Sequence, residues 1–365
     1  MSPTDTPHDP NRTRHGSPDP AAKYDAILVV SFGGPEGPDD VMPFLENVLR
    51  RRNVPRERML AVAEHYYRVG GVSPINAQNR ALIAALKEEL AAHDVNLPVY
   101  WGNRNWHPLL PDTLRQMQAD GVRRAIAFFT SAYSSYSGCR QYRENILEAQ
   151  AAVGPDAPQI DKLRVFFNHP GFIEPMIEQV RAAIAKLPAD LQAVPHLVFT
   201  AHSIPTSMAT GSRYVAQLEE ACRLVAGAFP SLPYRLVFQS RSGPPTQPWL
   251  EPDVGDYLKQ LASEGAKSVV VVPIGFISDH MEVIHDLDHE AHDIATEAGL
   301  AMTRAGTVGT HPQFVSMIRE LIGERLGTVT ERRALGTLGP SHDVCPVDCC
   351  PAPVMGGPPR STTGR

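Results

Sequence analysis

The chain has 365 residues, with 42% hydrophobic and 20% charged residues, values that are typical of globular proteins. Lys and Arg number 34 against 40 Asp and Glu, a net charge of −6, which argues against binding to nucleic acid or anionic lipid through a basic surface. No apolar run approaches the roughly 20 residues of a membrane-spanning helix, and residues 1–20 lack an apolar signal segment. We predict a cytoplasmic protein with no nucleic-acid partner and no stable membrane insertion.

Eight short apolar runs alternate with helical patterns along the chain. The runs are uninterrupted and rich in β-branched or aromatic residues, as expected for strands buried on both faces of a parallel sheet. They lie at residues 26–30, 98–101, 124–129, 164–167, 196–200, 235–238, 268–273 and 300–303. Helical spacing recurs over 76–93 and 213–228, so the alternation predicts an α/β fold with right-handed crossovers.

The two halves of the chain resemble each other weakly. AILVVSFGGP and HLVFTAHSIP are each a strand ending in a Ser-bearing turn closed by Pro, and RRAIAFFTSAYSS and AKSVVVVPIGFIS each run into a hydroxyl-rich loop. We predict two βα domains, residues 23–155 and 156–310, that face each other across a cleft, with ligands outside the carboxyl ends of the strands. Residues 311–350 are predicted to form a C-terminal helix and cysteine cluster that return to the first domain. The tails 1–22 and 351–365 are predicted to be disordered.

Two features of the second half carry candidate chemistry. His202 follows a buried strand at the cleft edge, where it is either a residue that caps the strand or a proton acceptor. Glu282, Asp286 and Glu290 recur four residues apart on one helix face, although like charges at this spacing cost about 0.2–0.5 kcal/mol per pair. The row is either a solvated acidic face or a path of oxygen ligands for a divalent metal. His285, His289 and His292 add possible nitrogen ligands, although the segment contains no H-E-x-x-H motif.

Two loops of the first half suit acidic substituents of a ligand. GGVSPIN joins two helices through a Gly-Gly turn, with Ser73 as the expected N-cap residue, and its hydroxyl would also suit a carboxylate. GNRNWHP follows a strand, and its Arg104 could anchor an acidic group. The turn SFGGPEG is not G-x-G-x-x-G, and its Pro35 removes an N–H that a pyrophosphate would need, so nucleotide binding is not expected.

In chain order, the chain contains GGVSPIN, GNRNWHPL, TAHSIP, VFQSRSGPPTQPWLEPD and VPIGFISDHMEVIHDLDHE, which together resemble the ferrochelatases. These lyases of haem biosynthesis insert Fe²⁺ into a porphyrin. The resemblance covers residues 24–326 and implies two Rossmann-like domains whose parallel sheets face each other across a porphyrin cleft. It implies that His202 and Glu282 are catalytic and metal-binding, on opposite faces of a distorted macrocycle. Asp286 and Glu290 would belong to an acidic line on a π-bulged helix that carries metal or protons.

The same resemblance implies a set of substrate-binding residues. These are Ser73, Tyr133, Tyr142, Arg68 and Arg104. Ser73 would contact a porphyrin propionate, and Tyr133 and Tyr142 would lie in the loop that covers the ring. Relatives from low-GC Gram-positive bacteria carry an iron-ligating Tyr after the first strand, where this chain has Phe32, which argues against an axial phenolate.

The five cysteines are unevenly placed, and they are too few for a disulfide scaffold. Clustered cysteines in an intracellular chain more often bind metal. Cys345, Cys349 and Cys350 resemble the pattern of actinobacterial ferrochelatases, whose fourth ligand matches Cys139, and the resemblance implies a 2Fe-2S cluster. A zinc site or reactive tail thiols are the alternatives. Cys222, on an apolar helix stripe, is predicted to belong to the core.

The resemblance favours coproporphyrin III over protoporphyrin IX as the substrate, together with Fe²⁺. The product would be Fe-coproporphyrin (coprohaem), and a coprohaem decarboxylase would be a transient downstream partner. One alternative is a protoporphyrin IX ferrochelatase. An alternative of another class is a porphyrin or metal carrier without turnover, which an assay of turnover distinguishes from both enzymes.

Overall fold

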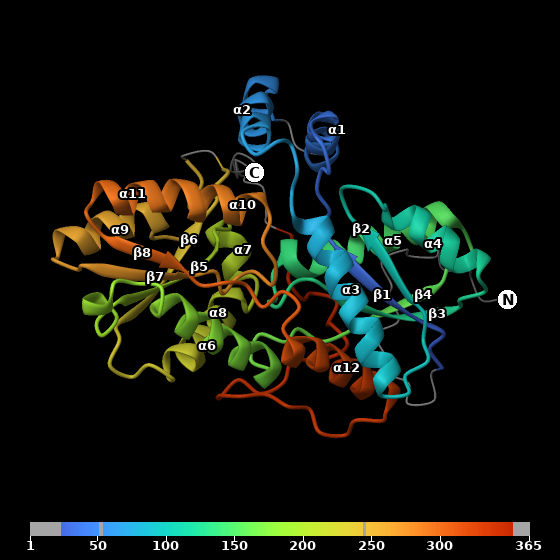
Figure 1. Cartoon of the computed structure of the whole chain (residues 1–365). Helices are drawn as coiled ribbons and strands as arrows, with labels where there is room; N and C mark the ends of the chain where they lie inside the picture. Colours follow the sequence, from blue (N-terminus) through green and yellow to red (C-terminus); the bar gives the residue numbers. More distant parts are fainter. Residues whose placement is uncertain (1–22, 51–53, 244–245, 353–365) are drawn as a thin grey trace, which may run out of the picture.

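The computed structural model describes residues 23–50, 54–243 and 246–352, and its strands form two parallel four-stranded sheets (Figure 1). The first sheet has the order β2-β1-β3-β4, with β1 Ala26–Ser31, β2 Val99–Asn103, β3 Arg124–Phe129 and β4 Gln159–Lys162. The second has the order β6-β5-β7-β8, with β5 His196–His202, β6 Tyr234–Gln239, β7 Ser268–Val272 and β8 Ala301–Arg304. The segment 1–22 and the part of the predicted tail from residue 353 onward lie outside the described residues.

The intervals between strands are mostly helical. The helices are α1 Pro38–Leu49, α2 Arg56–Tyr67, α3 Ile75–Ala92, α4 Leu110–Ala119, the π-helix η1 Tyr136–Arg140, α5 Gln141–Val153, α6 Pro170–Ile184, the short 3-10 helix η2 Ala189–Leu191, α7 Thr206–Thr210, α8 Tyr214–Ala226, α9 Val254–Ser263, α10 Met281–Val283, the π-helix η3 Ile284–Ala291, α11 His292–Glu297 and α12 Pro312–Leu326. The predicted helices 76–93 and 213–228 are confirmed as α3 and α8. Within the described ranges, no helix combines the length and the apolar character needed to cross a bilayer.

The two sheets repeat one strand order, because β1, β2, β3 and β4 occupy the positions of β5, β6, β7 and β8. This equivalence confirms the resemblance between the halves that the sequence showed, since both predicted pairs of segments fall on equivalent strands. All neighbouring strands are parallel, so their carboxyl ends meet at one edge of each sheet. The α/β prediction is therefore confirmed.

Helices cover both faces of each sheet, which explains why the strands are apolar throughout. In β1, Ile27 and Val29 pack with α3 and α12, whereas Leu28 and Val30 pack with α4 and α5. The second sheet has α6 and α8 on one face and α9 and α11 on the other. Helix α12 packs against both α3 and α6, so the helical layers of the two sheets share one continuous core (Figure 1).

The fourth predicted strand, 164–167, is wrong. The strand is β4, five residues earlier, and it pairs with β3. Residues 164–167 are buried without joining a sheet, and the Arg164 guanidinium makes two hydrogen bonds of 2.8 Å to Glu324 on α12. Burial against helices produced the same apolar signal as a strand. The predicted boundary at 155/156 consequently separates β4 from its own sheet and is placed too early.

Candidate active site

A solvent-open cleft of about 1630 Å³ lies at the carboxyl ends of both sheets. Its walls come from the loops after β1, β2, β3, β5, β6 and β7 and from helices α1 and α2, which stand above the gap between the sheets in Figure 1. Apolar side chains such as Phe32, Phe44 and Trp249 alternate in the lining with hydroxyl groups such as Ser131 and Ser135. The cleft therefore suits a large ligand with apolar faces and polar substituents.

His202 and Glu282 meet in this cleft from two loops of the second half. His202 is the last residue of β5, and Glu282 lies in α10, ten residues after the end of β7. The Nε2 atom of His202 is 3.6 Å from Oε2 of Glu282. The Nδ1 atom of His202 lies 2.5 Å from the Ser203 carbonyl oxygen, so Nδ1 must carry the hydrogen that is donated to it. In neutral His202 the free lone pair is therefore on Nε2, the atom that faces Glu282.

The charge of Glu282 favours protonation of His202. Burial disfavours the imidazolium form of His202, but attraction by the Glu282 carboxylate and hydrogen bonds to Glu282 and Ser203 outweigh it and raise the pKa of His202. His280 is the N-cap residue of α10, and its Nδ1 accepts a hydrogen bond of 3.2 Å from the Glu282 N–H. Burial and repulsion from His202 lower the pKa of His280, against the attraction of Glu282. The site thus holds one imidazole that gains a proton readily beside one that resists protonation.

The contact between His202 and Glu282 contradicts the prediction that they lie on opposite faces of the macrocycle. A flat ring needs van der Waals distance on both of its faces, and side chains 3.6 Å apart leave no room for it between them. Both groups belong to one wall of the cleft. The sequence could not show this, because the two residues are 80 positions apart and only the paired strands β5 and β7 bring their loops together.

The predicted acidic row continues from Glu282 along the π-helix η3, whose presence agrees with the expected π-bulge. Asp286 Oδ2 accepts hydrogen bonds from the Ser240 hydroxyl and, at 3.3 Å, from Gln239 Nε2. Ser240 has φ +61°, a left-handed conformation that is unusual for a residue with a side chain and that here presents its hydroxyl to Asp286. The end of β6 therefore fixes the second carboxylate of the row.

The far end of the row contains a possible metal site. His285, Asp286 and Glu290 offer ligand atoms that all lie within 4.8 Å of one another. The hydrogen bond to Asp286, with attraction by Glu290, raises the pKa of His285, and burial raises the pKa of Glu290. The His285 ring stacks on His65 of α2 with centroids 3.8 Å apart. His285 was among the nitrogen ligands that the sequence suggested, whereas His65 was missed, because a lone histidine on a helix carries no pattern.

Ser73 is buried and belongs to the lining of the cleft. A Cβ atom on Gly34 would lie 2.8 Å from Ser73 Cβ, so the glycine in the loop after β1 allows the two loops to approach. The prediction that Ser73 is an N-cap residue is wrong. Helix α3 begins at Ile75 after Pro74, with no side-chain hydrogen bond at its cap.

The other predicted substrate residues occupy different places. Arg104 and Tyr142 line the cleft, with the guanidinium 4.4 Å from the centre of the Tyr142 ring and Arg104 Nε donating to Asn145 at 2.7 Å. Tyr133 also touches the cleft, but it is fully buried and its hydroxyl donates to the Ile274 carbonyl oxygen at 2.9 Å, which ties the loop after β3 to the loop after β7. Arg68 is exposed at the end of α2 and is not among the described cleft-lining residues.

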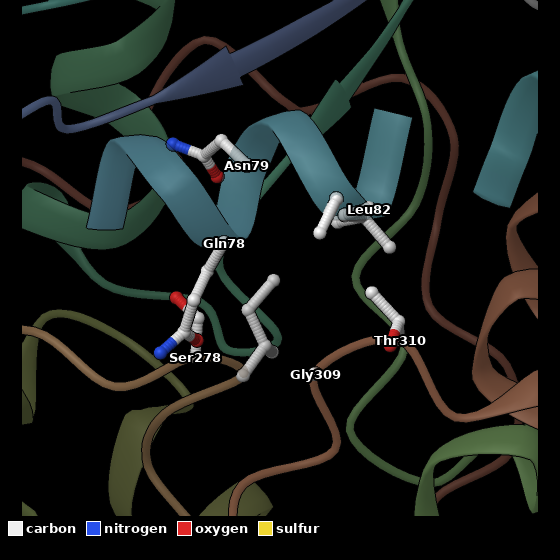
Figure 2. A pocket seen from close by; sticks show the side chains of 8 residues that line it. Gln78, Asn79, Leu82, Ser278, Gly309 and Thr310 are labelled. Atoms are coloured by element: carbon white, nitrogen blue, oxygen red, sulfur yellow. The ribbon is translucent and has the colours of Figure 1, made fainter. Parts of the chain in front are cut away.

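A second pocket, of about 510 Å³, lies between α3 and the loops 277–278 and 309–310 (Figure 2). Beside it, Gln78 Oε1 accepts a hydrogen bond of 2.9 Å from the Asp279 N–H. The Asp279 carboxylate is held by Arg304 at 3.2 Å. These contacts tie α3 of the first half to the segment that leads into α10, and so they help to position Glu282.

The predicted cysteine ligands come together at one place. Cys139 lies in η1, and its thiol is a close neighbour of the Cys345 thiol. Cys349 Sγ lies 3.6 Å from Cys350 Sγ and 3.8 Å from Nε2 of His342, a possible ligand that sequence reasoning missed. Its neighbours Cys139 and Cys349 lower the pKa of Cys345, and Cys349 likewise lowers the pKa of Cys350. Cys222 is buried in the main core, as predicted.

This donor set fits either of the two groups that the sequence suggested. Four thiols from two distant segments converge, as for an iron–sulfur cluster, and thiolates with one imidazole also suit zinc. Three of the four cysteines are buried, so a metal held there would be largely enclosed. Disulfide bonds do not link these cysteines.

The two-sheet fold is shared with the chelatases, proteins that place a metal ion in a macrocycle. A solved structure of the same fold, SirB from Bacillus subtilis with Fe³⁺, matches with a TM-score of 0.52 and 13% identity, covering 84% of this chain and 98% of that chain. The sequence matches the ferrochelatase family over residues 24–326, and the chain belongs to that family.

Curated relatives are similar over nearly their whole length. A ferrochelatase of Rhodopirellula baltica is 58% identical over 342 residues, covering 92% of this chain and 97% of the relative. A coproporphyrin III ferrochelatase of Streptomyces griseus is 55% identical over 353 residues, covering 91% of this chain and 94% of the relative. A further coproporphyrin III ferrochelatase, of Streptomyces coelicolor, is 53% identical. The recognition made from sequence motifs is confirmed.

Proposed function

We propose that the chain inserts Fe²⁺ into coproporphyrin III to give Fe-coproporphyrin, and that His202 and Glu282 are its catalytic residues. The observation that carries the proposal is the 3.6 Å contact between the His202 imidazole and the Glu282 carboxylate in the wall of a cleft large enough for a tetrapyrrole. Relatives named coproporphyrin III ferrochelatase support the choice of porphyrin. The product would pass to a coprohaem decarboxylase, a transient partner in this proposal.

His202 supplies the base for the reaction. Metallation removes the pyrrole protons, and neutral His202 accepts one at Nε2, the nitrogen whose lone pair is free because Nδ1–H is donated to Ser203. Glu282 then faces a newly formed imidazolium at 3.6 Å and stabilises it. Both groups act from the same side of the ring, so the opposite face rests on the apolar part of the cleft.

The carboxylates beyond Glu282 deliver the metal in this proposal. Fe²⁺ binds carboxylate oxygen and imidazole nitrogen, and His285, Asp286 and Glu290 offer both within 4.8 Å of one another. Asp286 is one helical turn from Glu282 and is held by Ser240 and Gln239, so the ion can pass between fixed ligands. Ser73 and Arg104 receive the propionate groups of the porphyrin at the cleft wall.

The test is anaerobic Fe²⁺ insertion followed by absorbance, with coproporphyrin III and protoporphyrin IX side by side. Higher kcat/KM with coproporphyrin III is expected. Preference for protoporphyrin IX would retain the chemistry and refute the substrate. Binding of both porphyrins without turnover would refute the enzyme and leave a carrier.

We further propose that Cys139, Cys345, Cys349 and Cys350 hold a 2Fe-2S cluster. Such a cluster supplies a one-electron redox centre. The convergence of the four thiols and the lowered pKa of Cys345 support this ligand set, because thiolates are the ligating form. Anaerobically purified protein should be brown and contain acid-labile sulfide, and the variant Cys349→Ser should be colourless. Zinc without sulfide in the purified protein would refute the cluster.

A further inference from the structure

Helix α2 contacts the second half of the chain through one of its faces. The helix belongs to the first half, between β1 and β2, and stands above the gap between the sheets (Figure 1). Arg58 Nη2 donates a hydrogen bond of 3.1 Å to the Ser242 carbonyl oxygen, and the His65 ring stacks on His285. Residues seven apart lie on the same side of a helix, so both contacts come from one face. All twelve residues of α2 are described, and of these only Ala63 is buried, so core packing does little to fix the helix.

The His285 ring has an orientation that its own helix does not dictate. Its Nδ1 atom is 3.3 Å from Asp286 Oδ1 and 3.8 Å from Glu290 Oε2. Glu290 is five residues later, a spacing that a π-helix places on one face, so this approach follows from η3. Asp286 is the next residue, and the side chains of consecutive helical residues do not face each other. The ring is therefore turned along the helix towards Asp286, an orientation that a contact from outside η3 can fix.

His65 supplies that contact. The two imidazole rings are parallel within 1° and their centroids are 3.8 Å apart, which is stacking distance. Stacking covers one face of the His285 ring and leaves Nδ1, on its edge, directed at the two carboxylates. The contact of Arg58 lies on the same side of the site, because Ser242 is two residues after Ser240, whose hydroxyl donates to Asp286. Docking of α2 thus bears on two of the three possible ligands.

We propose that His65 is a positioning residue for the metal path, which by stacking on His285 holds that imidazole beside the two carboxylates. The metal site is then complete only when α2 is docked on the second half. The inference rests on the proposed delivery of Fe²⁺ by His285, Asp286 and Glu290. Ligands that neighbouring residues already orient lose less freedom when they bind an ion, so a held imidazole raises the affinity. Since Tyr66 of the same helix lines the cleft, α2 shapes the metal site and the porphyrin site together.

The test is anaerobic calorimetric titration of the full chain with Fe²⁺, without porphyrin. Carboxylate and imidazole ligands suit this ion, and the binding that is absent from Asp286→Asn defines the site. His65→Ala should weaken that binding about tenfold, the lower end of the usual effect of residues that orient metal ligands. His65→Phe keeps a flat ring on His285 and should restore most of the affinity. Tyr67→Ala, which removes an exposed ring from the same helix, is the matched control and should bind Fe²⁺ like wild type.

Insertion kinetics give a second readout. His65→Ala should raise KM for Fe²⁺ and leave kcat and the KM for coproporphyrin III close to wild type, a split that general destabilisation would not produce. Because alanine favours helix and His65 lies on the surface of α2, this variant should keep the wild-type far-ultraviolet circular dichroism.

Three results would overturn the inference. Wild-type Fe²⁺ affinity in His65→Ala refutes it and leaves the metal path intact. Equal losses in His65→Ala and His65→Phe also refute it, because the nitrogen atoms of His65, and not its stacking, are then required. If Asp286→Asn binds Fe²⁺ as the wild type does, the proposed metal path fails and the inference fails with it.

Discussion

Replacing Glu282 by Gln should shift the pH dependence of metal insertion towards acid. The substitution removes a charge whose oxygen lies 3.6 Å from His202 Nε2 and keeps the size of the side chain. Two unit charges at this distance attract by about 1.2 kcal/mol in a water-like dielectric, and half of the Glu282 side chain is exposed, so this screened magnitude applies. The binding constant for the proton on His202 should therefore fall about sevenfold.

The direction follows from the pKa of His202. In the wild type that pKa is raised, and the base form that accepts a pyrrole proton accumulates only as the pH rises through it. Without the carboxylate the pKa is lower, so the acidic limb of the kcat/KM profile should move to lower pH, while the maximum rate falls because the imidazolium loses its stabilising partner.

The assay is kcat/KM for anaerobic Fe²⁺ insertion as a function of pH, together with an NMR titration of the His202 imidazole. Glu178→Gln is the matched control, since it removes a carboxylate 3.1 Å from His311, which is outside the described cleft lining. An acidic limb that stays in place or moves to higher pH in Glu282→Gln would refute the electrostatic coupling.

Three further substitutions separate the functions of the fold, the metal path and the porphyrin site. Arg164→Met should destabilise the protein by about 3–5 kcal/mol, because it leaves the buried Glu324 carboxylate without its doubly bonded partner; an unchanged urea midpoint would contradict this. Asp286→Asn should raise KM for Fe²⁺ several-fold without changing porphyrin affinity, and equal losses of both would argue against a metal path. Ser73→Ala should weaken porphyrin binding about tenfold through a lost hydrogen bond to a carboxylate, measured by fluorescence quenching; weaker iron use alone would contradict it.

The sequence predicted the fold well where local pattern and burial agree. Strands such as β1 and β7 are apolar because helices cover both faces, and that pattern is visible in a few consecutive residues. The prediction of the fourth strand failed for the same reason. The segment 164–167 is equally apolar, but it packs against α12 instead of pairing with a neighbouring strand. The half-buried edge strand β4, QIDK, carries too few apolar residues to be recognised.

The site was predictable only in part. His202, Glu282 and the cysteine group stood out because they belong to unusual motifs. The contact between His202 and Glu282 could not be predicted, because it depends on how the loops after β5 and β7 converge. The prediction that the two residues lie on opposite faces of the macrocycle failed for this reason. His280 was missed because its significance comes from His202, a neighbour far away along the chain.

The most direct test of the central claim compares wild type and His202→Ala in one anaerobic mixture of coproporphyrin III and Fe²⁺, with porphyrin binding and metallation followed separately. We expect His202→Ala to bind the porphyrin with near wild-type affinity, because Ser73, Arg104 and the apolar cleft wall are intact, and to lose metallation at least a hundredfold, the usual contribution of a positioned base. Metallation by His202→Ala at the wild-type rate would contradict the assignment of the base and with it the proposed mechanism.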